Sequence, residues 1–448
     1  MQVGVWVFRG ADRLLNIVRW RYLRSMTKLG ARLGQGVSAL SPYTILDLSE
    51  GGHNLCGRLL GDLGAHVIRV EPIGGSPTRL RGPFVKVGSS PVEGSLYWAA
   101  YNSNKIGITL DLESERGRVI FLDLVKEADA ILESYPPGYM ENLSLGYDVL
   151  KVSNPGLVYT SITPFGESGP HSRFQSSDLI SSAMGGMPYL SGDVDRPPVR
   201  ISFPQAELNA GSQAFAGTMA ALWHSRRSGN GQRIEISEQI SVIWTLMNAT
   251  TFPPLHRVDM QRAGSFRRRG PIDARHVFRC ADGHVTLLPQ AATLQKFKEW
   301  MVEEGYLPED ALGFEPAGWD VRENTSKDSD QIREFQRLEE IIERFLLSKK
   351  KSELFERAVS DGLLIAPCNT VADISESIQL KAREYWVDLY HPEFEREIKH
   401  LGPPVKLTKT PASTRIPSPF IGQHNHKVYS NLGIDSAEQS ILISEGVI

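Results

Sequence analysis

One carboxylate, Glu207, stands at a corner of the chain where chemistry could take place. It follows the short apolar run 197–203 and the turn at Pro204, and a helix of small residues is predicted from about Asn209 to Ser225. An acid at a helix N-terminus is stabilised by the helix dipole by about 0.3–1 kcal/mol, so Glu207 could be an ordinary surface acid. Alternatively, it could be a nucleophilic carboxylate. The position of Glu207 relative to the other predicted elements distinguishes these interpretations.

Two further groups of polar residues lie where a site could form. His53 and Asn54 occupy the first predicted strand-to-helix turn, and Asp178 opens a predicted helix over 178–187. Turn chemistry explains His53 and Asn54 equally well. Asp178 is predicted to cap its helix, because Asp is a preferred N-cap residue. A role in the wall of a site is the alternative for all three.

Basic residues gather in two places. Arg69, Arg79, Arg81 and Lys105 lie in or beside loops that follow predicted strands, and Arg267, Arg268 and Arg269 lie in an irregular segment. Guanidinium groups match the geometry of phosphate oxygens, so either set could bind a phosphorylated ligand. A solvated basic loop is the simpler explanation of the second set.

Several familiar reaction types have no support in the sequence. We find no HExxH, P-loop or GxSxG pattern, and the glycines do not follow the GxGxxG spacing of dinucleotide-binding turns. Cys56, Cys280 and Cys368 are scattered and odd in number, which favours neither a disulfide framework nor a metal cluster and suggests a reducing, intracellular setting. We therefore expect no metal and no nicotinamide or flavin cofactor.

The length and overall composition are typical of a soluble globular protein of two domains. The chain has 448 residues, of which 41% are hydrophobic and 23% charged. The formal net charge of -3 argues against a nucleic-acid partner. No apolar run reaches the length of a membrane span.

Residues 1–40 differ from the rest. This stretch has seven Arg or Lys residues against the single acid Asp12, interleaved with apolar residues. It is predicted to be either a basic leader or membrane-surface helix, or an upstream extension with Met26 as the true start. We expect a cytoplasmic protein, or a mitochondrial one if the leader is real.

Strands and helices alternate through the first half of the chain. The apolar patterns predict strands at 43–48, 65–71, 106–112, 130–133, 157–162 and 232–237, with helices at 55–63, 113–128, 209–225 and 238–248. Such alternation predicts an α/β domain with a parallel sheet, whose ligand loops lie at the carboxyl ends of the strands.

A second, smaller α+β domain is predicted over 251–395. It contains a hairpin that turns at Asp282-Gly283 and long helices at 331–348 and 351–361. Residues 396–448 are predicted to return to the large domain 41–250, as loops and a last short helix.

A series of short motifs, in this order, resembles a known family. The motifs are 45–48, 60–72, 75–79, 104–105 and 109–112, followed by 133–138, 145–147, 154–159 and 226–233. They are similar to the motifs of the family III CoA-transferases, and the resemblance runs from about Tyr43 to about Gly433.

The resemblance implies a fold, a set of partners and a reaction. It implies a Rossmann-like large domain built from both ends of the chain, and two interlocked subunits, as a homodimer or as a heteromer with a related subunit. The substrates would be an acyl-CoA, which supplies coenzyme A, and a carboxylic acid. In the family, a carboxylate attacks the thioester to give a mixed anhydride, and free CoA then forms a thioester with that carboxylate.

The resemblance also implies roles for residues of this chain. The family's nucleophile is an Asp, and Glu207 matches its position with one additional methylene group. The implied CoA-binding residues are His53, Arg79, Lys105, Ser134, Tyr135, Asp178, Arg267 and Arg268. The family often has Asn and Arg where this chain has Ser134 and Pro136.

Two other functions stay open at this point. The Glu at the nucleophile position allows a catalytically silent subunit of a hetero-oligomeric CoA-transferase. An acyl-CoA racemase or isomerase is the third possibility, although Ser177 stands where that branch of the family carries a His base.

Overall fold

The computed structural model describes residues 38–86, 92–251, 253–254, 257, 260–269, 272–288, 291–313 and 329–448. Nearly all of the predicted leader, 1–40, therefore lies outside the described residues. The chain divides into two compact units. The first consists of Met1–Gly186, Ser202–Met247 and Ala382–Ile448, and the second of Met187–Ile201 and Asn248–Lys381.

The first unit is built on a six-stranded parallel sheet with the order β3-β2-β1-β4-β5-β6. Its strands are β1 (Thr44–Leu48), β2 (His66–Glu71), β3 (Lys105–Thr109), β4 (Ala130–Glu133), β5 (Val158–Thr163) and β6 (Arg233–Ser237). Ile45 pairs with Val67 on one side and with Ala130 on the other, so the chain reverses direction across the sheet between β1 and β4. This is the doubly wound order whose ligand crevice lies at the carboxyl ends of the strands, at that reversal. The predicted α/β class and parallel sheet are confirmed.

Side chains alternate between the two faces of the sheet along each strand. In β1, Ile45 contributes to one buried cluster and Leu46 to the other, and Val67 and Ile68 do the same in β2. Both faces are buried because helices cover both, which explains the nearly continuous apolar runs in the strands.

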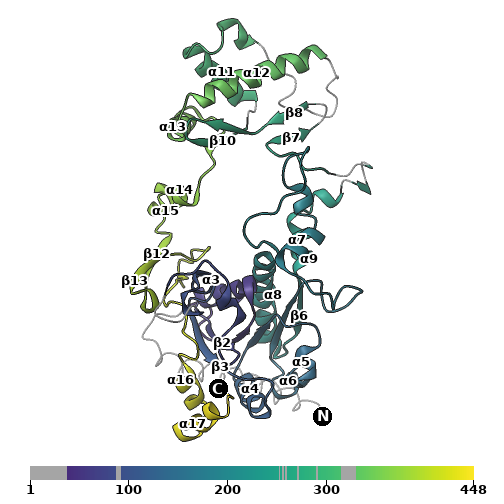
Figure 1. Ribbon diagram of the computed structural model, residues 1–448, viewed down its shortest axis with the longest axis vertical. Helices are drawn as coiled ribbons and strands as arrows, with labels where there is room; N and C mark the ends of the chain where they lie inside the picture. Colours follow the sequence, from purple (N-terminus) through teal and green to yellow (C-terminus); the bar gives the residue numbers. More distant parts are fainter. Residues whose placement is uncertain are drawn as a thin grey trace, which may run out of the picture. The chain divides into compact units, whose positions relative to one another are not determined.

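Helices of the first unit pack on both faces of this sheet (Figure 1). Buried residues of α2 (Asn54–Asp62) and α8 (Ala206–Ser228) join one cluster. Buried residues of α4 (Glu115–Lys126), α6 (Tyr147–Ser153), α16 (Asn425–Asn431) and α17 (Ser436–Ser444) join the other. The C-terminal segment thus returns to the large unit, with two helices where one was predicted.

Helix α8 forms because its sequence is rich in residues that favour helix and permit close packing. Ala206, Ala210 and Ala214 are fully buried, and alanine has the highest helix propensity. The helix ends at Gly229, whose φ of 79° is left-handed, as is common at helix C-caps. It begins at Ala206, earlier than the predicted Asn209, so Glu207 belongs to its first turn.

Other boundaries and elements differ from the predicted ones. β3 ends at Thr109 rather than at Leu112, and α7 spans Asp178–Met184. The hairpin of β12 (Trp386–His391) and β13 (Arg396–Leu401) belongs to the first unit. No α-helix in the described part of the chain combines the length and hydropathy that crossing a lipid bilayer requires.

The second unit has its own core. β9 (Val277–Cys280), β10 (Gly283–Leu287) and β11 (Ile365–Pro367) form an antiparallel sheet, which packs with α11 (Ala291–Glu303), α12 (Ser329–Leu347) and α13 (Lys351–Asp361). β7 (Phe266–Arg269) pairs with β8 (Ile272–Arg275), so the predicted irregular segment is a strand at Arg267 and Arg268. The second unit therefore has the predicted α+β class, with an antiparallel sheet and separate helices.

Candidate active site

Glu207 is a buried carboxylate beside the carboxyl end of β1. It lies in the first turn of α8, and only 6% of its surface is exposed. Its Oε2 accepts a hydrogen bond of 2.7 Å from the backbone N–H of Gly52, in the 3-10 helix η1 (Gly51–His53) that follows β1. Glu207 is therefore not a solvated surface acid, because its carboxylate points into the turn at the ligand edge of the sheet.

Arg81 forms an ion pair with the same carboxylate from the solvent side. Its Nη1 lies 2.6 Å from Glu207 Oε2 and its Nη2 lies 3.1 Å from Oε1, which makes a two-pronged ion pair. The side chain of Arg81 is 42% exposed, whereas that of Glu207 is 8% exposed. The ion pair thus joins a buried acid to a base that faces solvent.

The charge of Glu207 is stabilised despite its burial. Burial by itself raises the pKa of the carboxyl, because it penalises the ionised form. The hydrogen bonds and charge of Arg81, with smaller contributions from His53 and the Gly52 N–H, outweigh burial and lower the pKa of Glu207 below its ordinary value. Glu207 is consequently an ionised carboxylate at neutral pH, the form that a nucleophile needs.

Asp178 supports the backbone of Glu207. Its Oδ1 accepts a hydrogen bond of 3.1 Å from the backbone N–H of Glu207. Ser177, not Asp178, is the N-cap of α7, so the predicted cap of its own helix is wrong. Asp178 instead caps α8, where the N-cap residue Gln205 makes no side-chain cap. Burial and the neighbouring Glu207 charge raise the pKa of Asp178.

His53 pairs with Glu238 at the start of α9 (Glu238–Thr245). His53 Nε2 lies 2.9 Å from Glu238 Oε1, and both residues are buried. His53 Nδ1 and Glu238 Oε2 are buried without a hydrogen-bond partner. Sequence reasoning missed Glu238, although it directly follows β6 and so lies at the same edge of the sheet as His53.

Glycines allow these groups to come together. A Cβ on Gly51 would lie 2.5 Å from Glu207 Oε2, and one on Gly52 would lie 2.7 Å from Glu207 Cβ. Gly51 also has a φ of 62°, which favours glycine. The turn is recognisable in the sequence, whereas its contact with α8 is formed only in the folded chain.

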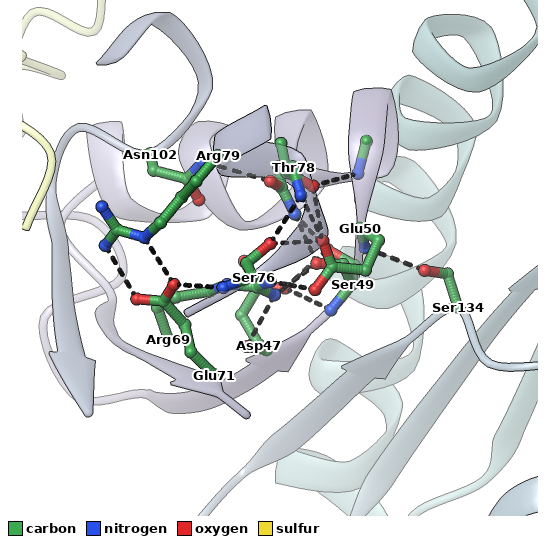
Figure 2. Close-up of polar contacts among 12 residues, drawn as sticks. Asp47, Ser49, Glu50, Arg69, Glu71, Ser76, Thr78, Arg79, Asn102 and Ser134 are labelled. Carbon is green, nitrogen blue, oxygen red and sulfur yellow. Dashed lines mark hydrogen bonds and ion pairs between the residues drawn. The ribbon is translucent and has the colours of Figure 1, made fainter. Parts of the chain in front are cut away.

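Arg79 and Lys105, which the resemblance implies as CoA ligands, are both fully buried. Arg79 pairs with Glu71 at 2.7 Å (Figure 2). Its guanidinium carbon also lies over Trp98, 3.9 Å from the ring centroid. Lys105 pairs with Asp47 at 2.7 Å. Neither side chain reaches solvent in this structure, which differs from the predicted phosphate contacts. Burial lowers the pKa of Lys105 to about 8, against the opposing effect of Asp47.

Glu50 is the centre of a polar network that holds the loops after β1 and β2. Its carboxylate accepts hydrogen bonds from Arg69, Thr78 and Ser76, and its backbone N–H donates to Ser134 Oγ over 2.8 Å (Figure 2). The predicted CoA residue Ser134 therefore joins the loop after β4 to the loop after β1.

Tyr135, also implied as a CoA ligand, lines a cavity of about 360 Å³. It stacks on Tyr139 with ring centroids 4.5 Å apart. The cavity lies beyond the carboxyl ends of β2 and β3, and its other lining residues include Glu71 and Asp111. Tyr135 and Tyr139 thus form an aromatic part of the wall of this cavity.

The remaining candidates lie elsewhere or cannot be placed. Arg267 and Arg268 belong to β7 in the second unit, and their side chains lie outside the described residues. Within the ranges that the structure describes, no three His, Cys, Asp or Glu side chains are grouped so that they could hold a metal ion.

Known proteins are similar to this chain over most of its length. Residues 40–425 match the model of CoA-transferase family III. The chain is 30% identical, over 91% of its length and 98% of the relative's, to the succinyl-CoA:(R)-benzylsuccinate CoA-transferase subunit BbsE of Thauera aromatica. It is 29% identical, over 92% of its length and 99% of the relative's, to the formyl-CoA:oxalate CoA-transferase of Streptomyces coelicolor.

Solved structures give the same result. The crystal structure of a CaiB/BaiF family protein from Brucella suis superposes with a TM-score of 0.73 at 27% identity, over 87% of this chain and 98% of that one. The family match, the similar enzymes and the shared fold together lead to one conclusion: this chain is a member of CoA-transferase family III.

Proposed function

We propose that this chain transfers CoA from an acyl-CoA donor to a carboxylic acid acceptor, with Glu207 as the nucleophile. The observation that carries the proposal is the buried, ionised carboxylate of Glu207, held by Arg81 and the Gly52 N–H. The relatives support the reaction class, since several are named as CoA-transferases acting on succinyl-CoA or formyl-CoA.

The reaction would proceed by covalent catalysis at Glu207. A Glu207 oxygen attacks the thioester carbon, the C–S bond breaks, and CoA leaves as a thiolate. The thiolate then attacks Glu207 Cδ and the donor acid is released as a carboxylate. CoA is now bound to Glu207 as a thioester. An acceptor carboxylate reverses these steps and leaves as the new acyl-CoA.

The neighbouring residues would position the substrates. His53 and Asp178 border Glu207 and would line the acyl end of the site. Ser134 and Tyr135 would contact CoA, with Tyr135 against the nucleobase. The predicted interlocked dimer would complete the site, and Arg267 and Arg268 of β7 are proposed to bind phosphate.

Trapping of the covalent intermediate tests the proposal. The purified chain is incubated with succinyl-CoA or formyl-CoA, treated with hydroxylamine, and digested for mass spectrometry. We expect a hydroxamate at Glu207 and none at exposed Glu445, which serves as the internal control. Absence of any modification at Glu207, while a family enzyme with the usual Asp is labelled in parallel, would overturn the assignment.

A second candidate function rests on the similarity to a protein named as a subunit. The chain would then be the silent partner of a related subunit that carries the usual Asp. In that case the purified chain is inactive, and Glu207→Ala leaves the activity of the mixed complex unchanged. Loss of that activity in Glu207→Ala would instead assign the chemistry to this chain. The racemase alternative would need exchange of an α-proton into deuterated water, and Ser177 supplies no base for it.

A further inference from the structure

Among the described residues that contact Glu207, Arg81 is distinguished by three properties. It makes a two-pronged ion pair with the nucleophile, its side chain is 42% exposed, and Glu207 is the one carboxylate it pairs with among the described residues. The buried cations nearby, such as Arg79, are instead committed to other acids.

The backbone of Arg81 is fixed while its guanidinium faces the site. Its N–H donates to Thr78 O over 3.1 Å, and its carbonyl accepts from Ser95 Oγ over 2.5 Å. The guanidinium lies over the ring of Tyr97, 5.6 Å from its centroid. An anchored backbone with an exposed head group allows the two nitrogens to meet a second carboxylate without a change in fold.

The charge of Glu207 changes during the proposed reaction, and the charge of Arg81 does not. In the resting pair, one carboxylate neutralises one guanidinium. When Glu207 becomes an anhydride or a thioester it is neutral, and Arg81 loses its partner. The Glu207 carboxylate is lost when the anhydride forms. In the thioester step the donor acid then leaves with the bridging oxygen and its electron pair, so a free carboxylate appears while Glu207 stays neutral.

We infer that Arg81 binds the carboxylate of the free acid substrate whenever Glu207 is esterified with CoA. This inference rests on the proposed role of Glu207. The ligand class is a free carboxylic acid, which the guanidinium fork holds by two hydrogen bonds. Because the same fork lies 2.6 and 3.1 Å from the Glu207 oxygens, an acid bound there is next to Glu207 Cδ, the atom it must attack.

Isotope exchange tests this without knowledge of the natural acceptor. The probe is labelled succinate or formate, whichever acid belongs to the acyl-CoA that modifies Glu207. The wild-type chain should transfer the label into that acyl-CoA, because release and return of the acid form one half-reaction. We measure the KM of the acid in this exchange for wild type, Arg81→Lys, Arg81→Gln and Arg81→Ala.

The expected result separates binding of the acid from folding. Loss of a charge-assisted contact should raise the KM of the acid about 10- to 100-fold, more in Arg81→Gln than in Arg81→Lys, while acyl-CoA still labels Glu207. Free guanidinium should partly restore exchange in Arg81→Ala, which a merely structural role would not predict.

Arg116→Gln is the matched control. Arg116 also lies 2.6 Å from a carboxylate, that of Glu445, and is 43% exposed. The Arg116→Gln variant should leave the KM of the acid unchanged. An unchanged KM in Arg81→Gln, with Glu207 labelled, would overturn the inference and leave the proposed function standing. Failure of acyl-CoA to label Glu207 in wild type would overturn both.

Discussion

The backbone N–H of Gly52 donates a 2.7 Å hydrogen bond to Glu207 Oε2, although 155 positions separate the two residues. The turn after β1 and the first turn of α8 therefore form one unit around the carboxylate. Gly52 makes this contact possible, because an added Cβ would lie 2.7 Å from Glu207 Cβ and 3.2 Å from its backbone carbon.

Gly52→Ala should therefore displace Glu207 and lower activity. Overpacking of this kind costs about 1–3 kcal/mol, which thermal unfolding would detect, and a shift of about 1 Å can reduce the rate about 10²-fold. Gly217→Ala in α8 is the control, since its Cβ would meet the Ile234 methyl at 3.3 Å and the Ile236 methyl at 3.9 Å. Equal activity of the two variants would contradict the close-packing argument.

Glu207→Gln keeps the size of the side chain and removes the nucleophile. We expect the turnover number to fall by about four orders of magnitude or more, measured with succinyl-CoA and a panel of acids. Glu207→Asp shortens the side chain by one methylene and should lose about 10²-fold if the site is fitted to Glu. A fully active Glu207→Gln chain would rule out covalent catalysis at this residue.

The lowered pKa of Glu207 sets the acid side of the pH profile. Glu207 is ionised above its ordinary pKa and loses its charge only as the pH falls through the lowered value in the folded chain. Because Arg81 opposes burial, Arg81→Gln should move the acid limb of the rate profile to higher pH. Rates of Glu207 labelling between pH 4 and 8 measure this shift, and coincident limbs would contradict it.

Lys105 is predicted to matter for stability. Its Nζ donates to Asp47, Asn102 and the carbonyl of Asn54, all within 2.9 Å, and Lys105 and Asp47 are fully buried. Lys105→Met leaves the Asp47 charge facing the more distant cation Arg69, at 3.7 Å, and the hydrogen bonds from Ser49, and should cost about 3–5 kcal/mol in urea unfolding.

The exposed pair Lys126–Asp123 provides the comparison for that variant. Lys126→Met should cost less than about 1 kcal/mol, because exposed ion pairs contribute little. A similar small loss in Lys105→Met would show that the buried pair is not needed for the fold.

Glu133 should make stability depend on pH. Burial raises its pKa to about 7, and it is 4% exposed. A carboxyl with a raised folded pKa stabilises the fold at low pH, and this contribution is lost as the pH rises from about 4.5 through 7. Glu133→Gln should therefore be more stable than wild type at pH 8 by on the order of 1–3 kcal/mol, but not at pH 4.5. Thermal unfolding of both chains at pH 4.5 and pH 8 measures this. The same difference in stability between the variant and wild type at both pH values would contradict the prediction.

Much of the large domain follows from local pattern. β4 (Ala130–Glu133) and α13 (Lys351–Asp361) begin and end at the predicted residues, because short apolar runs and amphipathic spacing between turn residues specify them. β3 ends at Thr109, three residues before the predicted end. Leu110 and Leu112 are also buried and apolar, and apolarity does not distinguish a strand from a packed loop. β7 was not predicted at all, since its arginine-rich sequence carries no strand signal.

The candidate site was predictable only in part. The sequence by itself determined the family, the parallel α/β fold and the placement of Glu207 near the start of a long helix, because these depend on local patterns and motif order. The apolar run 197–203 before this helix is an exposed segment and not a strand. The pairing of Glu207 with Arg81, of His53 with Glu238 and of Asp178 with the α8 backbone was decided by the tertiary structure.

The physical reason lies in distance along the chain. Arg81 and Glu207 are 126 positions apart, and Arg79 and Arg81 look alike as neighbouring bases in one loop. Packing of η2 (Pro77–Leu80) buries Arg79 on Glu71 and turns Arg81 toward Glu207. Whether a charged side chain stabilises the fold or faces a substrate depends on its burial and partners, and only the folded chain fixes both.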